Sequence, residues 1–276
     1  MESSGTLVIK VGGKEVEEGP FLERFSEWVA DAVHAARRVV VVHGGGEEIS
    51  RRMAALGLTV VKVDGRRVTS PEALPIVIGV LAGEINLRIV SNLRGHGVVP
   101  IGLTGASADL LQAKLAEDGR LGRVGEPSVV DASLLWGLLY NGLTPVVAPI
   151  APGEDGKLLN VNADSFAGAL ASTLGGDLLF VTDVAGILGT DGVALPEVTP
   201  STAAELLRAG VIREGMVPKV SAALGALRSG ARRAWIGPLT PLLRDHALPP
   251  GGTSVVLSSA ERHYHFTPLA PLEGTG

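Results

Sequence analysis

The chain has 276 residues, of which 46% are hydrophobic and 19% charged, with a formal net charge of −5 and no cysteine. The lack of cysteine excludes a disulfide framework and a thiolate metal site, and the lack of a basic stripe argues against a nucleic-acid partner. No apolar run approaches the ~20 residues of a membrane span and no signal peptide is evident, so we expect a cytoplasmic protein without membrane contact, of one large or two modest domains.

Two short apolar runs that stop in glycines stand out in the N-terminal part. Residues 7–11 run into Gly12-Gly13, and residues 39–42 run into His43-Gly44-Gly45-Gly46. Runs without alternation indicate strands that are buried on both faces of a parallel sheet. The two glycine turns should then lie side by side at the carboxyl edge of the sheet, where open α/β folds bind ligands. The helices expected after these turns cover residues 21–36 and 47–55.

The central part of the chain predicts one long helix and a group of hairpins. Ser70 as cap and Pro71 at the first helical position begin a helix expected over residues 71–94. Asp118-Gly119 and Gly122 interrupt the apolar stretches of residues 111–130, which indicates hairpins at the edge of the sheet. The strands expected around them are residues 58–63 and a buried strand over residues 98–103.

Capping and turn residues delimit the later elements. Asp131 begins a helix that Asn141-Gly142 ends in the manner of a left-handed cap, and Asp155-Gly156 forms a hairpin turn. Residues 215–219 are expected to be a loop that leads into a helix. The remaining expectations are strands over 144–149, 178–182, 233–236 and 254–257, helices over 131–140, 163–174, 201–209 and 220–229, and a loosely held tail over 258–276.

Three charged residues in particular settings indicate phosphoryl transfer. Lys10 stands inside a buried strand, where a lysine is costly unless it is paired or used. The chain has neither a Walker loop nor a Gly-x-Gly-x-x-Gly fingerprint after the first strand. Phosphoryl transfer needs positioning and cations, so Lys10 and Lys219 would neutralise the γ-phosphoryl oxygens while Asp164 orients both lysines. The backbone amides expected to cradle the phosphoryl group are those of Gly12, Gly13, Gly44 and Gly45.

Six short motifs, in a fixed order, are together similar to one family. The chain resembles the acetylglutamate kinases of the amino-acid kinase superfamily over nearly everything from Leu7 to Val256. The motifs are Lys10-Val11-Gly12-Gly13, His43-Gly44-Gly45-Gly46, Arg67-Val68-Thr69, Asn160-Val161-Asn162-Ala163-Asp164, Thr182-Asp183-Val184 and Gly215-Met216-Val217-Pro218-Lys219.

The resemblance implies roles for these positions. Lys10 and Lys219 correspond to transition-state lysines, and Asp164 to an organising carboxylate. Arg67 corresponds to the arginine that grips the substrate's α-carboxylate, and Asn160 to an asparagine that hydrogen-bonds the bound amino acid. The remaining implied positions are Gly44 and Gly45 for substrate and phosphoryl group, and Gly12, Gly13, Asp183, Gly215 and Met216 for nucleotide and phosphate.

The resemblance also implies a fold and an activity. The fold would be a three-layer αβα sandwich around a mainly parallel open sheet, with an N-terminal lobe over 1–175 for the acyl amino acid and a C-terminal lobe over 176–257 for the nucleotide. The reaction would be attack of the γ-carboxylate of N-acetyl-L-glutamate on Mg·ATP, in arginine synthesis. No metal site made by the protein is expected, because the nucleotide carries the Mg²⁺, and the N-terminal lobe would form a homodimer.

Some positions depart from the family's pattern, and two rival functions stay open. Arg66 stands where the family often has leucine, and Glu214 where it often has glycine. Only Met1–Gly5 precede the first strand, so a dimer without the extra N-terminal helix of arginine-inhibited members is expected. One rival is a kinase that acts on carrier-bound aminoadipate or glutamate. The other is a non-catalytic sensor of amino acid and nucleotide.

Several of these residues also have ordinary structural interpretations. His43 is expected to be a hydrogen-bonded turn residue rather than an acid or base. Asn160 and Asn162 could be hairpin or capping residues, an interpretation that suits Asn162 in particular, and Asp164 could be only a helix cap or a first-turn charge favoured by the helix dipole. Asp183 either lies at the edge of the nucleotide or merely ends a strand. His263 and His265 are interpreted as tail residues.

Overall fold

The protein, seen in a computed structural model, is built around one open sheet, and the structure describes residues 5–63, 65–213, 215–240, 248–258 and 261. All neighbouring strands are parallel except β13 and β14, which are antiparallel. The predicted mainly parallel sheet is therefore confirmed. The strands lie in the order β12 (Glu197–Val198), β14 (Thr253–Val255), β13 (Arg233–Gly237), β11 (Asp177–Val181), β1 (Thr6–Val11), β2 (Arg38–His43), β8 (Thr144–Ala148) and β5 (Pro100–Thr104).

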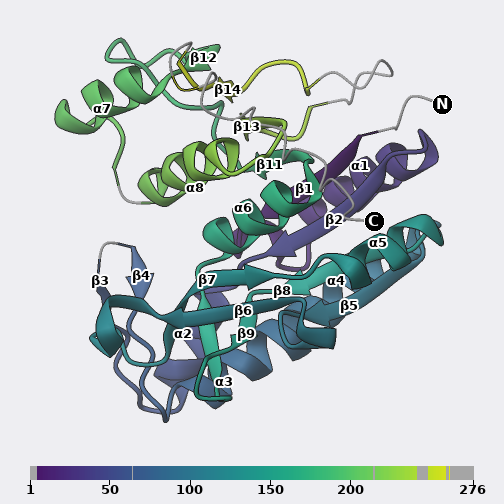
Figure 1. Cartoon of the computed structure of the whole chain (residues 1–276), viewed down its shortest axis with the longest axis vertical. Coiled ribbons are helices and arrows are strands. Elements are labelled where there is room, and N and C mark those ends of the chain that lie inside the picture. Colours follow the sequence, from purple (N-terminus) through teal and green to yellow (C-terminus); the bar gives the residue numbers. More distant parts are fainter. Residues whose placement is uncertain (1–4, 64, 214, 241–247, 259–260, 262–276) are drawn as a thin grey trace, which may run out of the picture.

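Helices cover both faces of this sheet and make the predicted three layers (Figure 1). Side chains of β1 alternate between the two faces, with Leu7 and Ile9 in one apolar cluster and Val8 in the other. Because both clusters are fully buried, the strand needs apolar residues at every position, which is why its sequence does not alternate. One face carries α1 (Pro20–His34) and α4 (Asn86–Gly95), and the other carries α5 (Ser133–Tyr140), α6 (Ala163–Leu174) and α8 (Met216–Arg228).

The hairpins predicted at the sheet's edge belong instead to a separate four-stranded sheet, which corrects that expectation. Its order is β6 (Leu111–Leu115), β7 (Val124–Val130), β10 (Leu158–Val161) and β9 (Ile150–Pro152). The reason is the parallel pairing of β7 with β10, which sets Asn160 beside Val124, a long-range partner that no local pattern identifies. A two-stranded hairpin of β3 (Lys62–Val63) and β4 (Arg66–Arg67) projects beside α2 (Gly46–Ala55) in Figure 1.

Three further predictions on the central part are corrected. The strand expected over 58–63 shrinks to β3, which is exposed and pairs only with β4. The strand expected to be buried, β5, is the half-exposed edge of the main sheet. The long helix begins at Leu74 rather than Pro71, because Ser70 closes a turn in which its carbonyl accepts the amides of Ala73 and Leu74.

That helical stretch continues without a break from Leu74 to Gly95, which makes it long and apolar enough to cross a membrane by length and composition. It consists of α3 (Leu74–Ile78), a π-helix over Gly79–Ile85 and then α4. Val77, Ile85, Ile89 and Leu93 of this stretch are fully buried in one of the two apolar clusters. The helix is therefore a core element of this fold.

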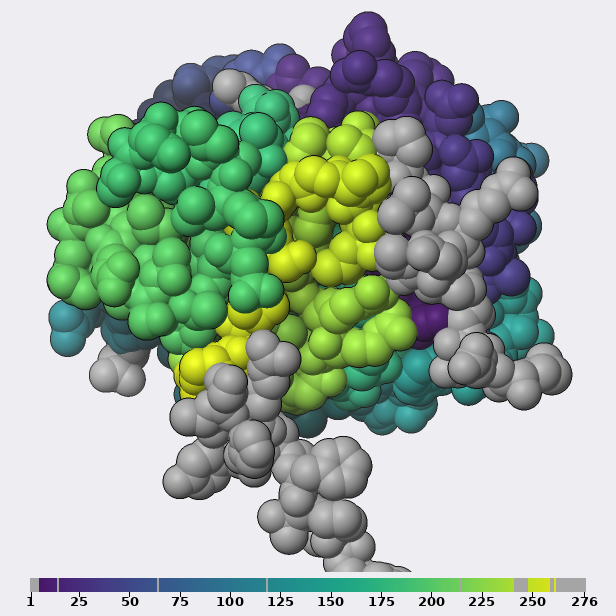
Figure 2. Space-filling model, turned by 90° about the horizontal axis from the view of Figure 1, so that it is seen from above, coloured from purple at the N-terminus to yellow at the C-terminus, as the bar shows by residue number. Residues whose placement is uncertain are grey.

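The remaining elements lie close to their predicted positions, with one exception. The exception is α8, which begins at Met216, so Lys219 lies in its first turn and not in a loop. Seen from above in Figure 2, the green residues around α7 (Pro200–Arg208) lie beside the yellow residues around β14. Of the tail predicted over 258–276, only Ser258 and Glu261 are among the described residues, and His263 and His265 lie outside them. The short 3₁₀ segments are Lys14–Val16, Ser107–Asp109 and Ala116–Gly119.

Candidate active site

The two glycine turns lie side by side, as predicted. The amide of Gly44 donates to the carbonyl of Val11 at 3.0 Å, and a Cβ added to Gly13 would lie 2.8 Å from the amide nitrogen of Gly46. A Cβ on Gly45 would meet side-chain carbons at 2.6 and 2.7 Å. None of these glycines has a positive φ. Gly13 is therefore required for the close approach of the two turns, and Gly45 for close packing against side chains, rather than for left-handed conformations.

Lys10 and Asp164 form a buried ion pair at the carboxyl end of β1. The Nζ of Lys10 lies 2.9 Å from Oδ1 of Asp164, and both side chains are almost wholly buried. Oδ1 accepts no well-aligned hydrogen bond, so the contact is electrostatic and leaves directional capacity for another donor. Asn162 caps α6, since its Oδ1 accepts the amides of Asp164 at 2.9 Å and Ser165 at 3.2 Å. The expected cap is confirmed, and it frees the Asp164 carboxylate to face Lys10.

Lys219 shares the electrostatic environment of this pair. Its Nζ donates to the carbonyl of Gly215 at 3.0 Å, the residue that precedes α8. Burial lowers the pKa of Lys219, which means that the ammonium is partly desolvated, and nearby charges oppose or add to this effect. Those charges, in decreasing order, are Asp164, Lys10, Glu15 and Asp183. The structure thus brings Lys10, Asp164 and Lys219 into one charged group.

Arg67 is buried with neutral partners only, among the residues that the structure describes. Its Nη2 donates to the carbonyl of Gly46 at 2.5 Å and to Oγ of Ser50 at 2.7 Å, and its Nη1 lies 3.5 Å from Sδ of Met53. Burial lowers the pKa of this guanidinium. A desolvated cation whose described partners are uncharged is suited to bind an anion bidentately.

Asn160 is linked to Arg67 through a threonine. The Nδ2 of Asn160 donates to Oγ1 of Thr69 at 3.1 Å, and this hydroxyl donates to the carbonyl of Arg67 at 3.1 Å. The chain of hydrogen bonds joins β10 to the segment after β4. It fixes the amide group of Asn160 relative to the backbone of Arg67.

Half of the predicted site residues line one cavity of about 170 Å³. The cavity also has an apolar wall that includes Ile49, Leu81 and Val124. An anionic ligand with an apolar portion would suit this mixture of cations and apolar side chains. The predicted residues that line it are Lys10, Gly44, Gly45, Arg67, Asn160 and Asp164.

The other predicted residues do not line this cavity. Gly12 and Gly13 belong to the adjoining turn, and Gly215 precedes α8. Met216 packs partly buried against the apolar core, whereas Asp183 is exposed and accepts a bond from Oγ1 of Thr182 at 3.3 Å. Their nucleotide roles stay predictions. Within the described residues, no group of three or more His, Cys, Asp or Glu side chains could hold a metal ion.

His43 is a structural residue, in agreement with the expectation from the sequence. It is fully buried, its Nδ1 lies 3.2 Å from the carbonyl of Gly44, and its Nε2 lies 3.2 Å from Nδ2 of Asn86. Because Asn86 Nδ2 is a donor, Nε2 accepts and Nδ1 carries the proton. Burial lowers the pKa to about 4, with the nearby Lys10 charge acting in the same direction and the Gly44 bond opposing it. The imidazole is therefore neutral at physiological pH.

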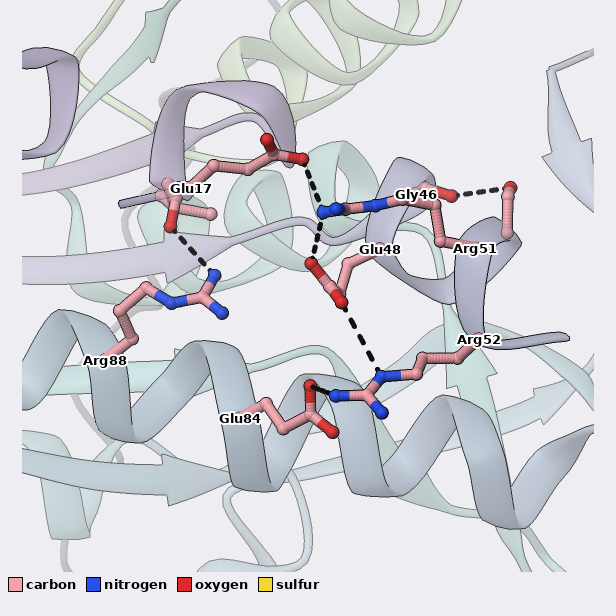
Figure 3. A network of polar contacts seen from close by, with 9 residues as sticks. Glu17, Gly46, Glu48, Arg51, Arg52, Glu84 and Arg88 are labelled. Carbon is pink, nitrogen blue, oxygen red and sulfur yellow. Dashed lines mark hydrogen bonds and ion pairs between the residues drawn. The ribbon is translucent and has the colours of Figure 1, made fainter. Parts of the chain in front are cut away.

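The helix that supplies the acceptors of Arg67 is held by a network of charges (Figure 3). Arg51 bridges Glu48 and Glu17 at 2.5 and 2.9 Å, and Arg52 bridges Glu48 and Glu84 at 3.6 and 2.8 Å. The network ties α2 to the segment after β1 and to the π-helix. Gly46 and Ser50 of α2 are thereby kept in place for Arg67.

Sequence reasoning missed several residues at the cavity. Lys62 and Arg66 of the β3–β4 hairpin line it, and Ser50 contacts Arg67. Arg66, noted above only as a departure from the family's pattern, is paired to two glutamates and only about a quarter exposed. The scarcity of lysine in this chain was a usable signal for Lys62, because only six lysines occur. For Ser50 no local signal exists.

Comparisons with known proteins agree on one family. A sequence model of the amino acid kinase family matches residues 5–238. An acetylglutamate kinase of Chloroflexus aurantiacus is 46% identical over 228 residues, which are 81% of this chain and 88% of that protein. An acetylglutamate kinase of Chloroflexus aggregans is 42% identical over 257 residues, with 92% and 97% covered.

Solved structures show the same fold. The structure of smu.665 from Streptococcus mutans has a TM-score of 0.76 at 28% identity, over 91% of this chain and 98% of that one. An N-acetylglutamate synthase from Neisseria gonorrhoeae has a TM-score of 0.78 at 22% identity, over 93% of this chain and 60% of that one. The second likeness concerns the fold alone.

Proposed function

Because the chain belongs to the amino acid kinase family, we propose that it phosphorylates the γ-carboxylate of N-acetyl-L-glutamate with ATP in arginine biosynthesis. The observation that carries the proposal is the single cavity lined by both the buried Arg67 and the Lys10–Asp164 pair. A substrate with two carboxylates would place the α-carboxylate on Arg67 and the γ-carboxylate near Lys10. Asn160 would hydrogen-bond the bound amino acid between them.

The reaction makes one bond and breaks one. An oxygen of the γ-carboxylate attacks the γ-phosphorus of ATP, the bond from that phosphorus to the β,γ-bridging oxygen breaks, and ADP leaves with the electron pair. The carboxylate is already ionised at physiological pH, so no general base is needed. The neutral, buried His43 agrees with this requirement.

The protein's contribution is then positioning and charge. Lys10 and Lys219 neutralise the oxygens of the transferred group from two sides, and Asp164 orients both ammonium groups. The amides of Gly12, Gly13 and Gly45 would donate to the group, whereas the amide of Gly44, expected among these donors, already donates to the carbonyl of Val11. Such preorganised donors act most strongly in a site that excludes water.

Mg²⁺ would enter with the nucleotide and neutralise charge on its phosphates. Mg²⁺ usually takes one or two carboxylates and completes its shell with phosphate and water oxygens. The exposed carboxylate of Asp183, whose charge acts on Lys219, would fit that demand. Gly215 and Met216 at the start of α8 would contact the nucleotide.

We also propose how the chain is divided and assembled. Residues 1–175 would form the acyl-amino-acid lobe and residues 176–257 the nucleotide lobe, joined by the pairing of β1 with β11. The edge strand β5, with the exposed Val99 and Leu87 nearby in the chain, supports a homodimer through the N-terminal lobe. The enzyme would act in the cytoplasm.

The test is an ADP-release assay with Mg·ATP and three acceptors, namely N-acetyl-L-glutamate, free glutamate and N-acetyl-aminoadipate. Hydroxylamine in the assay traps an acyl phosphate as a hydroxamate. We expect hydroxamate with N-acetyl-L-glutamate alone. No product with any acceptor, from a folded protein that binds ATP, would contradict the proposal and favour a carrier-bound substrate or a sensor.

A further inference from the structure

Arg66, the residue next to Arg67, also lines the cavity, but its guanidinium is bound by two glutamates outside the predicted site. Arg66 donates through Nη2 to Oε1 of Glu117 and through Nη1 to Oε1 of Glu126 at 3.2 Å. Glu117 lies in the 3₁₀ segment after β6, and Glu126 lies in β7. Both ion pairs therefore cross from the β3–β4 hairpin to the four-stranded sheet.

The alternation of an extended strand explains why the two arginines differ. Successive side chains point to opposite faces, so Arg66 and Val68 share one face and Arg67 lies on the other. Val68 packs against Ala116, Leu121 and Val124, next to the acceptors of Arg66. Arg67 reaches Gly46 on α2 instead. A slip or twist of β4 would move the guanidinium of Arg67 out of the cavity.

The segment after Arg67 is anchored to the four-stranded sheet by its backbone, whereas none of the described residues of the hairpin before it makes such a backbone bond. The backbone amide of Thr69 donates to the carbonyl of Leu121 at 2.9 Å, and its backbone carbonyl accepts the amide of Arg123 at 2.6 Å. The hairpin itself has two-residue strands, with β3 exposed and paired only with β4. Among the described contacts, the Arg66 ion pairs are the side-chain links that tie the hairpin to the four-stranded sheet.

We propose that Arg66 is a positioning residue, which through Glu117 and Glu126 holds the β3–β4 hairpin over the cavity so that Arg67 and Lys62 face the substrate. The proposal rests on the proposed use of N-acetyl-L-glutamate. The ion pairs of Arg66 with Glu117 and Glu126 are partly exposed, so salt weakens them. The affinity for the acyl amino acid should therefore depend on ionic strength through Arg66 as well as through Arg67.

The test uses Arg66→Gln, the double variant Glu117→Gln/Glu126→Gln, and the triple variant that combines them. Arg228→Gln is the matched control, because this arginine makes a similar ion pair with Glu261 far from the cavity. We expect Arg66→Gln to raise the KM for N-acetyl-L-glutamate roughly 3- to 10-fold, as loss of two partly exposed pairs would, with kcat and the KM for ATP unchanged.

Two further readouts separate positioning from a general structural effect. The KM for the acyl amino acid should rise less steeply with salt in Arg66→Gln than in the wild type. Amide hydrogen exchange over residues 62–69, measured without substrate, should be faster in Arg66→Gln and in the double variant, and the triple variant should be no faster than either. The control should match the wild type in every respect.

The two proposals can fail separately. A wild-type protein that does not use N-acetyl-L-glutamate contradicts the proposed function, and hydrogen exchange then still decides the role of Arg66. Unchanged exchange over residues 62–69 in Arg66→Gln, or effects of Arg66→Gln and the double variant that simply add, would overturn the positioning role.

Discussion

The strands of the main sheet carry buried charge at both ends, and the two ends are satisfied differently. At the amino end, Asp177 begins β11 and is fully buried. Its two oxygens accept from Arg232 at 2.8 and 2.5 Å, from Arg233 at 3.0 and 2.6 Å, and from Arg37 at 3.3 Å. Burial alone would raise the pKa of Asp177, but the bonds from Arg233 and Arg232 hold it below its ordinary value.

At the carboxyl end, the Lys10–Asp164 pair is equally buried but has much less hydrogen bonding. Oδ1 of Asp164 accepts no aligned hydrogen bond, and Lys219 bonds to a carbonyl of its own helix. A carboxylate whose lone pairs are used stabilises the fold, whereas cations with capacity left can bind a ligand. From this difference we infer that the Asp177 cluster serves stability, and we assign the Lys10 group to the proposed activity.

The largest effect is expected from Asp177→Asn. The variant leaves Arg37 buried without a counter-charge, and removal of one partner from such a cluster costs about 3 kcal/mol or more of unfolding free energy. Chemical denaturation measures this loss. At a temperature where the variant is folded, KM and kcat should match the wild type. Normal stability of the variant, or a fall in kcat without a loss of stability, would contradict the assignment of the Asp177 cluster to stability.

The next effect concerns pH and the buried His43. The pKa of His43 is about 4 in the folded protein and has its ordinary value of 6.5 in the unfolded chain. Between pH 4 and pH 6.5 the unfolded chain therefore binds more protons than the folded protein. Stability from this group is full above pH 6.5 and is lost as pH falls towards 4, by up to about 3 kcal/mol. Denaturation at several pH values should show a shallower acid loss in His43→Asn than in the wild type. Parallel pH profiles would contradict the buried, neutral state.

Lys219→Ala should affect catalysis and leave stability alone. In the proposed mechanism its ammonium acts on charge that develops in the transition state, so kcat should fall roughly 10²-fold with the KM for both substrates little changed. Steady-state kinetics and a thermal melt check both halves of the prediction. Near-normal turnover would remove Lys219 from the charged group that we assign to activity.

The smallest effect is expected from Arg67→Gln. Glutamine keeps part of the packing but loses the charge, so the KM for N-acetyl-L-glutamate should rise about 10-fold, which corresponds to one charge-assisted contact. The KM for ATP should not move. The exposed Arg208 of α7 provides the control, because Arg208→Gln should leave all constants unchanged. An equal rise in both KM values would place Arg67 outside the acyl-amino-acid site.

Much of the fold could be predicted because its signals are local. The runs before Gly12 and Gly44 lack alternation since both faces of their strands are covered, and Asn162 and Gly142 have the expected cap and turn positions. The candidate cavity followed from the same logic. Two glycine turns at the ends of adjacent parallel strands must meet, and Lys10 must then lie beside them.

The wrongly predicted starts of two helices also have local causes. Lys219 was expected in a loop because Gly215 and Pro218 weaken a helical pattern, yet proline is tolerated in the first helical turn and α8 begins at Met216. At Pro71 the helix was predicted to begin too early. Proline suits a first helical position, but Ser70 closes a turn around it and the helix begins three residues later.

The sequence by itself determined the buried strands that end in the two glycine turns, the cap of α6 and the place of Lys10 beside those turns, because short-range periodicity and turn chemistry encode these features. Only the tertiary structure decided that β7 pairs with β10, that Arg66 pairs with Glu117 and Glu126, and that Asp177 gathers three arginines. Arg37 and Asp177 are 140 residues apart in the chain. Their attraction depends on distance in space, which no local pattern of residues records.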